Sequence, residues 1–309
     1  MIRVSSLGQP KNQTTSGLGQ ELPNRKRPLG MSQMGKISNQ DYTYIRELVY
    51  KETRINLGDS KRELVSARLG KRLRAHSLGS YTEYCKMLQS NPNSGELYHL
   101  IDAISTNHTF FFREINHFNF LNSVILPQFA NGQLGNKRDL KIWSCACSTG
   151  EEPYSLSIAL EEYLSGIPSL DWKIQCSDIS NRVLDFASKG IYEQERLKNV
   201  KPEWIKRYFQ KGEKQMQGYY RVRPEISKKL GFQRLNLFAP QYPWNEKFQV
   251  IFCRNVMIYF DRETQQELVG RLARHLVPGG YLLIGHAESL AGIKHPYESI
   301  KPAIYQLPA

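Results

Sequence analysis

The chain has 309 residues, 40% of them hydrophobic and 23% charged, as in a globular protein of roughly two domains without a membrane span or signal peptide. Its five cysteines include no C-x-x-C pair, which disfavours a disulfide framework or a zinc site and predicts a reducing, cytoplasmic location. The net charge of +13 is compatible with nucleic acid, anionic lipid or an acidic protein as partner and does not choose among them.

The first third of the chain divides into a polar tail and a helical region. Residues 1–36 are rich in Gly, Gln, Asn, Ser and Pro and carry six basic residues against one acid, which predicts a disordered basic tail. Helical apolar spacing begins after Ser38, and further helices are expected at about 60–76, 80–90 and 94–105. Residues 37–105 are therefore predicted to form a small all-helical domain.

From Leu140 onward the pattern alternates between strands and helices. We expect strands at 140–144, 172–176, 232–236, 249–253, 281–285 and 303–307, and helices at 153–164, about 180–188 and about 262–276. This alternation predicts an α/β fold with a parallel, doubly wound sheet. The pattern breaks at about 208–230, where turn glycines and the β-prone residues Tyr219–Val222 predict a small antiparallel insertion.

The segment Ile142–Tyr154 (IWSCACSTGEEPY) places a turn of small residues between a strand and a helix. Small side chains at a strand end let a ligand approach the backbone. Gly150 is the only glycine of this segment, so the G-x-G-x-x-G pattern of pyrophosphate binders is absent. Glu151 and Glu152 suit a cationic ligand such as S-adenosylmethionine, although acids at a helix start are also favoured by the helix dipole.

A second acid, Asp178, ends the next predicted strand. A carboxylate at this position can accept hydrogen bonds from ribose hydroxyls. It can also cap the helix that follows, so both interpretations stay open. Acids at two consecutive strand ends predict a nucleoside ligand.

Three segments identify a family: Thr106–Glu114 (TNHTFFFRE), Ser148–Tyr154 (STGEEPY) and Phe252–Phe260 (FCRNVMIYF). In this order they closely resemble the chemotaxis receptor methyltransferases, the CheR family, over about residues 37–307. The resemblance implies a class I S-adenosylmethionine-dependent methyltransferase fold over 106–309, with the helical domain before it and a β-subdomain inserted in it. Cys145 and Cys147 occupy positions that often hold alanine in the family, a small-for-small change.

The resemblance also implies which residues contact the cofactor. They are Asn107, Thr109, Arg113, Glu152, Asp178, Asn236, Leu237, Arg254 and Asn255. Phe110–Phe112 are expected in the core, and His286 either lines the site or packs against it.

The implied reaction is methyl transfer from S-adenosylmethionine to glutamate carboxylates of chemotaxis receptors, which forms the methyl esters used in sensory adaptation. A carboxylate is already ionised at pH 7, so neither a general base nor a metal is expected. We assign catalytic, orienting roles to Arg113 and Tyr259. The alternatives are an ion pair of Arg113 with an acid such as Glu114, and a buried Tyr259 with a satisfied hydroxyl.

Two surfaces are candidates for receptor binding. The second helix carries six basic residues and one acid, and Arg68, Arg72 and Arg74 are predicted to contact the receptor, unless the face is simply solvated. Residues Tyr219–Arg223 are predicted as an exposed edge strand for a receptor C-terminal peptide, with Arg221 or Arg223 on its carboxylate. The alternative for that insertion is a hairpin that only supports the cleft.

The sequence is also compatible with two other functions. The basic charge suits a nucleic-acid methyltransferase, but the Asn-Pro-Pro-aromatic segment of enzymes that act on flipped bases is absent, and Arg254–Met257 stands in that region. The other is a sensor that binds the cofactor without catalysis. We expect no nucleic-acid partner and no membrane insertion.

Overall fold

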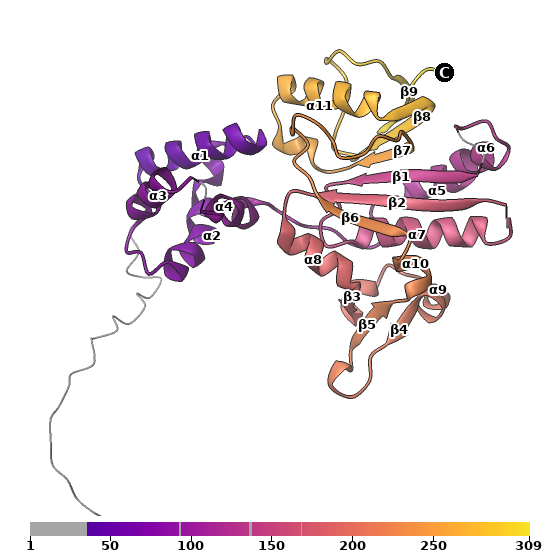
Figure 1. Cartoon of the computed structure of the whole chain (residues 1–309), viewed down its shortest axis with the longest axis horizontal. Coiled ribbons are helices and arrows are strands. Elements are labelled where there is room, and N and C mark those ends of the chain that lie inside the picture. Colours follow the sequence, from indigo (N-terminus) through magenta and orange to yellow (C-terminus); the bar gives the residue numbers. More distant parts are fainter. Residues whose placement is uncertain (1–35, 93, 136–137, 168) are drawn as a thin grey trace, which may run out of the picture.

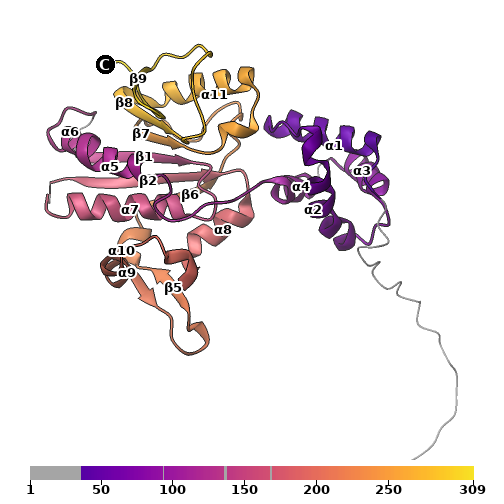
Figure 2. The same ribbon diagram turned by 180° about the vertical axis from the view of Figure 1, so that it is seen from behind.

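The computed structural model describes residues 36–92, 94–135, 138–167 and 169–309. The predicted disordered tail, residues 1–36, thus lies outside the described residues except for Lys36. Figures 1 and 2 show a helical domain beside a larger α/β domain, from which a small β-subdomain projects. None of the described helices is long and apolar enough to cross a membrane.

The helical domain consists of α1 (Asn39–Thr53), α2 (Arg62–Ala75), α3 (Tyr81–Ser90) and α4 (Glu96–Ile104). The Ser38 side chain caps α1 by accepting a hydrogen bond from the backbone N–H of Asp41. Helix α1 ends at Arg54, whose φ of 62° lies in the left-handed region. Ile55 therefore lies beyond the helix, where it packs against the cores of both domains.

A buried acid holds the helical domain together. The Glu96 carboxylate accepts hydrogen bonds from Arg72 (2.5 and 2.8 Å), from the Tyr84 hydroxyl (2.7 Å) and from His76 (2.7 Å). Burial raises the pKa of Glu96, but the hydrogen bonds from Arg72, Tyr84 and His76 outweigh it and lower the pKa to about 2. Arg72 is therefore required to neutralise a buried charge.

Arg68 also has a structural role. Its guanidinium donates to the carbonyl oxygens of Ile104 (2.5 Å) and Ser105 (3.1 Å), which belong to the end of α4. Arg68 and Arg72 thus have partners on α4 rather than within their own helix, and their predicted contact with a receptor stays a prediction. The exposed cations of this region are Lys61 and Lys71, with Arg74 partly exposed.

The α/β domain contains a seven-stranded sheet. Its spatial order is β6 (Leu230–Arg234), β2 (Asp171–Asp178), β1 (Asp139–Cys145), β7 (Phe248–Cys253), β8 (Leu276–Ile284), β10 (Ile304–Gln306) and β9 (Glu298–Lys301). The first five strands are parallel, and β10 runs antiparallel to β8 and β9. The chain leaves β1 for β2 on one side and later returns to β7 on the other, so the topological switch lies between β1 and β7.

Helices cover both faces of this sheet. They are α5 (Ile115–Phe120), the π-helical turn Leu121–Ile125, α6 (Leu126–Ala130), α7 (Glu151–Leu164), α8 (Asn181–Lys189) and α11 (Arg262–Arg274). Neighbouring residues of β1 serve opposite faces: Ile142 packs in the core with α7, and Trp143 in the core with α11. The predicted doubly wound fold is confirmed; β9 and residues 115–130 had no predicted element.

The β-subdomain differs from its prediction. Its sheet has the order β3 (Ile191–Glu193), β5 (Tyr219–Val222) and β4 (Phe209–Lys211). The predicted antiparallel hairpin is present as β4 and β5, but the subdomain begins at Ile191 rather than near 208, because β3 follows α8 directly. Residues Tyr219–Arg223 were predicted as an edge strand, and this is wrong: β5 is central and pairs on both sides. Short helices complete the subdomain: α9 (Pro202–Tyr208), α10 (Pro224–Ser227) and two 3-10 turns (Gln194–Leu197 and Lys214–Met216).

Candidate functional site

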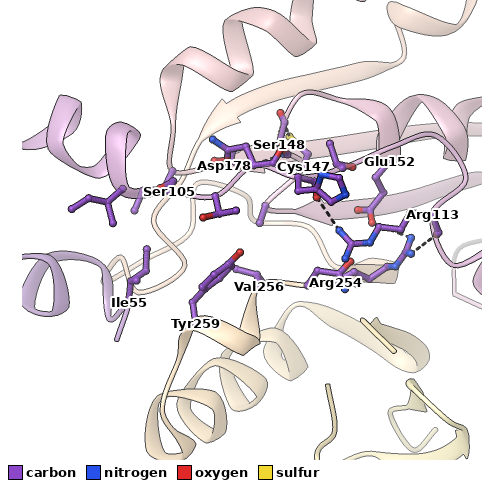
Figure 3. A pocket seen from close by; sticks show the side chains of 18 of the residues that line it. Ile55, Ser105, Arg113, Cys147, Ser148, Glu152, Asp178, Arg254, Val256 and Tyr259 are labelled. Carbon is purple, nitrogen blue, oxygen red and sulfur yellow. Dashed lines mark hydrogen bonds and ion pairs between the residues drawn. The ribbon is translucent and has the colours of Figure 1, made fainter. Parts of the chain in front are cut away.

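A cavity lies at the carboxyl ends of β1, β2 and β7, at the topological switch of the sheet. Together with its open mouth it contains about 1140 Å³ of empty space, enough for a nucleoside-sized ligand. Most of its lining residues come from four stretches of chain, within residues 55–57, 104–113, 146–152 and 254–259. The others are Lys61, Leu64, Phe118, Asp178 and Ile179. Figure 3 shows Asp178 and Ser148 on one side of the cavity and Tyr259 and Arg254 on the opposite side.

The turn between β1 and α7 adopts an unusual backbone conformation. Ala146 and Ser148 have φ angles of 53° and 52°, which cost roughly 1–3 kcal/mol each for residues with a Cβ. Gly150 has φ 94°, and a Cβ there would lie 2.7 Å from the Tyr192 hydroxyl oxygen. A glycine is therefore required at this position, and the strained turn brings backbone groups to the cavity wall.

Asp178 connects the two turns that border the cavity. Its carboxylate accepts hydrogen bonds from the backbone N–H of Ser148 (2.9 Å) and of Ser180 (3.0 Å). The cap of α8 is Ser180, whose hydroxyl accepts from the Val183 N–H at 3.3 Å, so Asp178 is not the capping residue. Burial raises the pKa of Asp178, and the backbone hydrogen bonds only partly offset this effect. A hydrogen-bond donor or a positive charge in the cavity would therefore stabilise the ionised carboxylate.

The two acids of the turn have different environments. Glu152 lines the cavity and accepts a hydrogen bond from the Ser144 hydroxyl at 2.6 Å. Burial raises the pKa of Glu152, and the nearby Arg254 opposes that effect. Glu151 instead faces the β-subdomain, where it pairs with Arg196 at 2.6 Å. Only Glu152 is therefore placed to meet a cationic ligand.

Arg254 is the central cation of the site. Its side chain is 2% exposed and pairs with Glu114 at 2.9 Å and with Glu152 at 3.2 Å. It also donates to the backbone carbonyl of Arg113. Burial raises the pKa of Glu114, but Arg254, the Asn255 amide and the His286 N–H more than offset this, so the pKa lies below its usual value. One guanidinium thus joins the segment before α5 to the helix α7.

Asn255 is fixed from both sides by carboxylates. Its backbone N–H donates to Glu288 at 2.9 Å, and its side-chain amide donates to Glu114 at 3.1 Å. Its φ of 58° is again in the left-handed region. Glu288 is buried and also accepts from the N–H groups of Gly285 (2.5 Å) and Ile258 (3.3 Å). Glu114 and Glu288 are organising residues that sequence reasoning missed, although Glu114 ends a segment it singled out and Glu288 lies two residues after His286.

The segment before α5 supplies polar groups to the cavity. Asn107, Thr109 and Arg113 line it, and the side-chain nitrogen of Asn107 is buried without a hydrogen-bond partner among the described residues. The Arg113 guanidinium donates to the His108 carbonyl at 2.9 Å, and Glu114 pairs with Arg254 instead of Arg113. The alternative of an Arg113–Glu114 ion pair is thus wrong. Of the three phenylalanines, Phe111 and Phe112 are in the core as expected, whereas Phe110 is 36% exposed and lines the cavity.

Tyr259 reaches into the cavity from the 3-10 turn Met257–Tyr259 (Figure 3). Its side chain is partly exposed, and no hydrogen bond from its hydroxyl occurs among the described residues. Its carbonyl oxygen accepts from the Asn56 N–H at 2.8 Å, so the helical domain contacts the α/β domain beside the cavity. The wall residues Ile55 and Lys61 of this domain were not predicted for the site, because their segment carries no motif.

Asn236 and Leu237 line a smaller recess that adjoins the main cavity and shares Asp178 and Tyr259 with it. The Asn236 side chain donates to the Glu52 carbonyl at 2.7 Å and accepts from the Phe238 N–H at 3.0 Å. Its amide is therefore already used by the protein. His286 does not line the cavity; it is exposed, and its ring packs against His117.

The residues around the cavity fit S-adenosylmethionine. The buried Asn107 nitrogen needs an acceptor, and the buried carboxylates Asp178 and Glu152 favour donors or positive charge. The ligand offers ribose hydroxyls, an ammonium, a sulfonium and a carboxylate. Seven of the nine predicted cofactor residues line the main cavity, and the other two line the adjoining recess.

Comparisons with known proteins agree with this geometry. Residues 40–105 match a family model described as the CheR methyltransferase all-alpha domain, and residues 107–305 match the CheR methyltransferase SAM binding domain. A chemotaxis protein methyltransferase of Escherichia coli is 39% identical over 90% of this chain and 94% of its own length. Another, from Borreliella burgdorferi, is 39% identical over 87% of this chain and 95% of its own length. A third, from Pseudomonas aeruginosa, is 39% identical over 87% and 93%, respectively.

Proposed function

Because this chain belongs to the CheR methyltransferase family, we propose that its cavity transfers the methyl group of S-adenosylmethionine to glutamate carboxylates of chemotaxis receptors. The protein is an S-adenosylmethionine-dependent methyltransferase, and its products are glutamyl methyl esters that serve sensory adaptation. The observation that carries the proposal is the cavity at the switch point, lined by two desolvated carboxylates and an unpaired buried amide. The proposal includes a cytoplasmic location and the division into a helical domain, 37–105, and a catalytic domain, 106–309.

The reaction needs alignment and dehydration more than proton transfer. When bound, S-adenosylmethionine supplies an electrophilic methyl group, and the substrate carboxylate is already an anion at pH 7. The chain contributes by fixing both partners in line, which is worth several kcal/mol. In this proposal Asp178 binds the ribose, Glu152 and Asn107 face the methionyl end, and Thr109 and Asn255 complete the wall. Asn236 and Leu237 border the adjoining recess, where Leu237 offers apolar contact.

We assign orientation of the reacting groups to Arg113 and Tyr259. Arg113 projects into the cavity with its guanidinium held by the His108 carbonyl and above the Phe110 ring, 5.8 Å from the ring centroid. A guanidinium in this position can hold the substrate carboxylate by a charge-assisted hydrogen bond. The Tyr259 hydroxyl, which has no protein partner among the described residues, is free to contact a ligand near the methyl group.

Tyr259→Phe is expected to lower kcat by about 5- to 10-fold, as loss of one hydrogen bond made in the transition state would. The temperature of unfolding should stay within the variation of the exposed control variant Tyr98→Phe. Steady-state kinetics with receptor fragments measures the effect. Full activity of Tyr259→Phe would remove the hydroxyl from the mechanism and leave the ring as packing.

For receptor docking we propose the exposed Lys61 and Lys71 and the partly exposed Arg74 of the α2 region. Lys61 lines the mouth of the cavity, so an acidic receptor helix bound there would lie close to the methyl group. Of the three arginines predicted from the sequence, Arg74 remains in this proposal. Arg68 and Arg72 are held by α4, and reversing the charge of Arg72 would leave Glu96 buried beside a second acid.

Lys61→Glu, Lys71→Glu and Arg74→Glu together are expected to raise the KM for receptor about 10-fold at low salt and to flatten its salt dependence. The affinity for S-adenosylmethionine should not change. The matched control reverses three exposed lysines elsewhere: Lys228, Lys247 and Lys294. Equal loss in both triple variants would indicate a general charge effect and contradict docking on this face.

We also propose that the β-subdomain binds a receptor C-terminal peptide as an added strand. The free edges are β3 and β4, and the exposed Arg221 and Arg223 lie on or next to the central strand β5. An extended peptide along an edge would gain backbone hydrogen bonds, and a guanidinium could meet its carboxylate.

Titration with C-terminal peptides of receptors from the same cell is expected to show binding that weakens at least about 10-fold in Arg221→Ala or Arg223→Ala. The control is Lys228→Ala, which removes an exposed cation outside the three strands. If none of these peptides binds, the subdomain is scaffold only.

A further inference from the structure

A group of possible metal-ligating side chains lies next to Arg254, which lines the cofactor cavity. Glu114, His117 and His286 bring one carboxylate oxygen and two imidazole nitrogens within 4.8 Å of one another. His117 lies on α5 and His286 follows β8, so two distant parts of the sequence meet here. The rings of the two histidines are 4.8 Å apart, centroid to centroid, and inclined at 76°.

His117 is the unexplained member of this group. Its side chain is fully buried, yet neither ring nitrogen has a hydrogen-bond partner among the described residues. Buried polar groups are nearly always satisfied, so an unpartnered imidazole calls for a ligand that the protein does not provide. The imidazole also borders a second cavity, which His286 lines as well.

The spacing of Glu114 and His117 suits a shared metal ion. Their nearest ligand atoms, Oε2 of Glu114 and Nδ1 of His117, are 3.5 Å apart. Two ligands held at about 2.0–2.2 Å from one tetrahedral ion lie at close to that separation. Glu114 is held in place by a left-handed backbone, φ 58°, and by hydrogen bonds from Arg254, Asn255 and the His286 N–H. Only the exposed His286 ring must approach to complete three ligands.

We propose that Glu114, His117 and His286 form a binding site for a divalent transition-metal ion of the Zn²⁺ class, coupled to the cofactor cavity. Two imidazoles and a carboxylate are ligands that Zn²⁺, Ni²⁺ and Cu²⁺ favour, whereas Mg²⁺ and Ca²⁺ prefer oxygen alone. The neighbouring cavity leaves room for water at the remaining coordination position. The ion is not needed for methyl transfer; its effect on that reaction is regulatory.

The coupling runs through the carboxylate of Glu114, which the ion would share with Arg254. Arg254 also pairs with Glu152 on the cavity wall. A metal ion bound to Glu114 would therefore add positive charge next to the Arg254–Glu152 pair. The site is then less favourable for the sulfonium of S-adenosylmethionine than for the uncharged thioether of S-adenosylhomocysteine. This part rests on the proposed function, whereas metal binding itself does not.

Calorimetric titration of the metal-free, tag-free full chain with ZnCl₂ tests the site without cofactor. We expect one ion per chain, no response to MgCl₂, and affinity reduced roughly 10- to 100-fold or more in His286→Ala. His286 is exposed and outside the cofactor cavity, so this variant should fold and keep its activity without metal. The matched control, His99→Ala, removes an exposed histidine on α4 and should bind Zn²⁺ like the parent.

Titration with cofactor in saturating Zn²⁺ tests the coupling. Zn²⁺ should lower the affinity for S-adenosylmethionine at least about fivefold and the affinity for S-adenosylhomocysteine by less. In His286→Ala, Zn²⁺ should change neither affinity. Absence of a stoichiometric ion, or equal Zn²⁺ binding by the parent and His286→Ala, would overturn the metal site. Unchanged cofactor affinity in the presence of a bound ion would overturn the coupling.

Discussion

Arg254→Met is expected to lower the free energy of unfolding by about 3–5 kcal/mol, because it removes the only cation paired with Glu114 and Glu152 among the described residues. Both carboxylates are largely buried, with side-chain exposures of 13% and 14%, so neither can be fully hydrated in the variant. Methionine has a similar volume to arginine but no charge. The loss of stability therefore comes from the unpaired carboxylates and not from a cavity. Urea unfolding of the parent and the variant measures it.

Two further variants separate charge from packing. Arg46→Met breaks the exposed Arg46–Asp59 pair and should cost at most about 1 kcal/mol. Combining Arg254→Met with Glu114→Gln and Glu152→Gln removes the buried negative charges and should restore part of the lost stability. If Arg254→Met is as stable as Arg46→Met, then the buried network does not hold the site together.

Asp178→Ala is expected to weaken the binding of S-adenosylmethionine by about 1–3 kcal/mol, which is roughly 5- to 150-fold in the dissociation constant. The carboxylate already accepts the N–H groups of Ser148 and Ser180, and its remaining lone pairs face a cavity that suits a ribose. Calorimetry with S-adenosylmethionine and S-adenosylhomocysteine should give similar losses, because both ligands carry the same ribose.

Asp178→Asn is the matched variant for this position. Asparagine keeps the shape of the aspartate side chain and one acceptor oxygen. It should therefore preserve the turn better than alanine does and still weaken the binding of both ligands. Near-parental affinity in a folded Asp178→Ala protein would remove Asp178 from the cofactor site. A loss confined to S-adenosylmethionine would indicate charge attraction to the sulfonium and contradict a ribose contact.

Local patterns predicted most of the fold. Strands β7 and β8 are mostly apolar, and α8 and α11 begin at the capping side chains of Ser180 and Asp261, so the alternation was visible from Leu140 onward. The central position of β5 was not predictable, because its partner β3 lies far back in the sequence, directly after α8, and contains only three residues. Such a short strand has no measurable period.

The site was predictable to the extent that its residues belong to contiguous motifs. Asp178 and Glu152 follow strand ends, so their meeting at one edge of the sheet follows from parallel topology. The partners of Arg254 were not predictable, since Glu114 lies 140 residues away and only tertiary structure joins them. Similarly, six basic residues on one helix suggested a binding face, whereas Glu96, 24 residues after Arg72, turned out to neutralise one of them.

Methylation of receptor glutamates is tested most directly by mass spectrometry of chemotaxis receptor fragments after incubation with this protein and isotopically labelled S-adenosylmethionine. RNA and DNA from the same cell serve as competing substrates in parallel reactions. We expect the labelled methyl group as a base-labile ester on glutamate side chains of the receptor, and no label on nucleic acid. Label on nucleic acid, or bound cofactor without methyl transfer to any receptor glutamate, would contradict the proposed function.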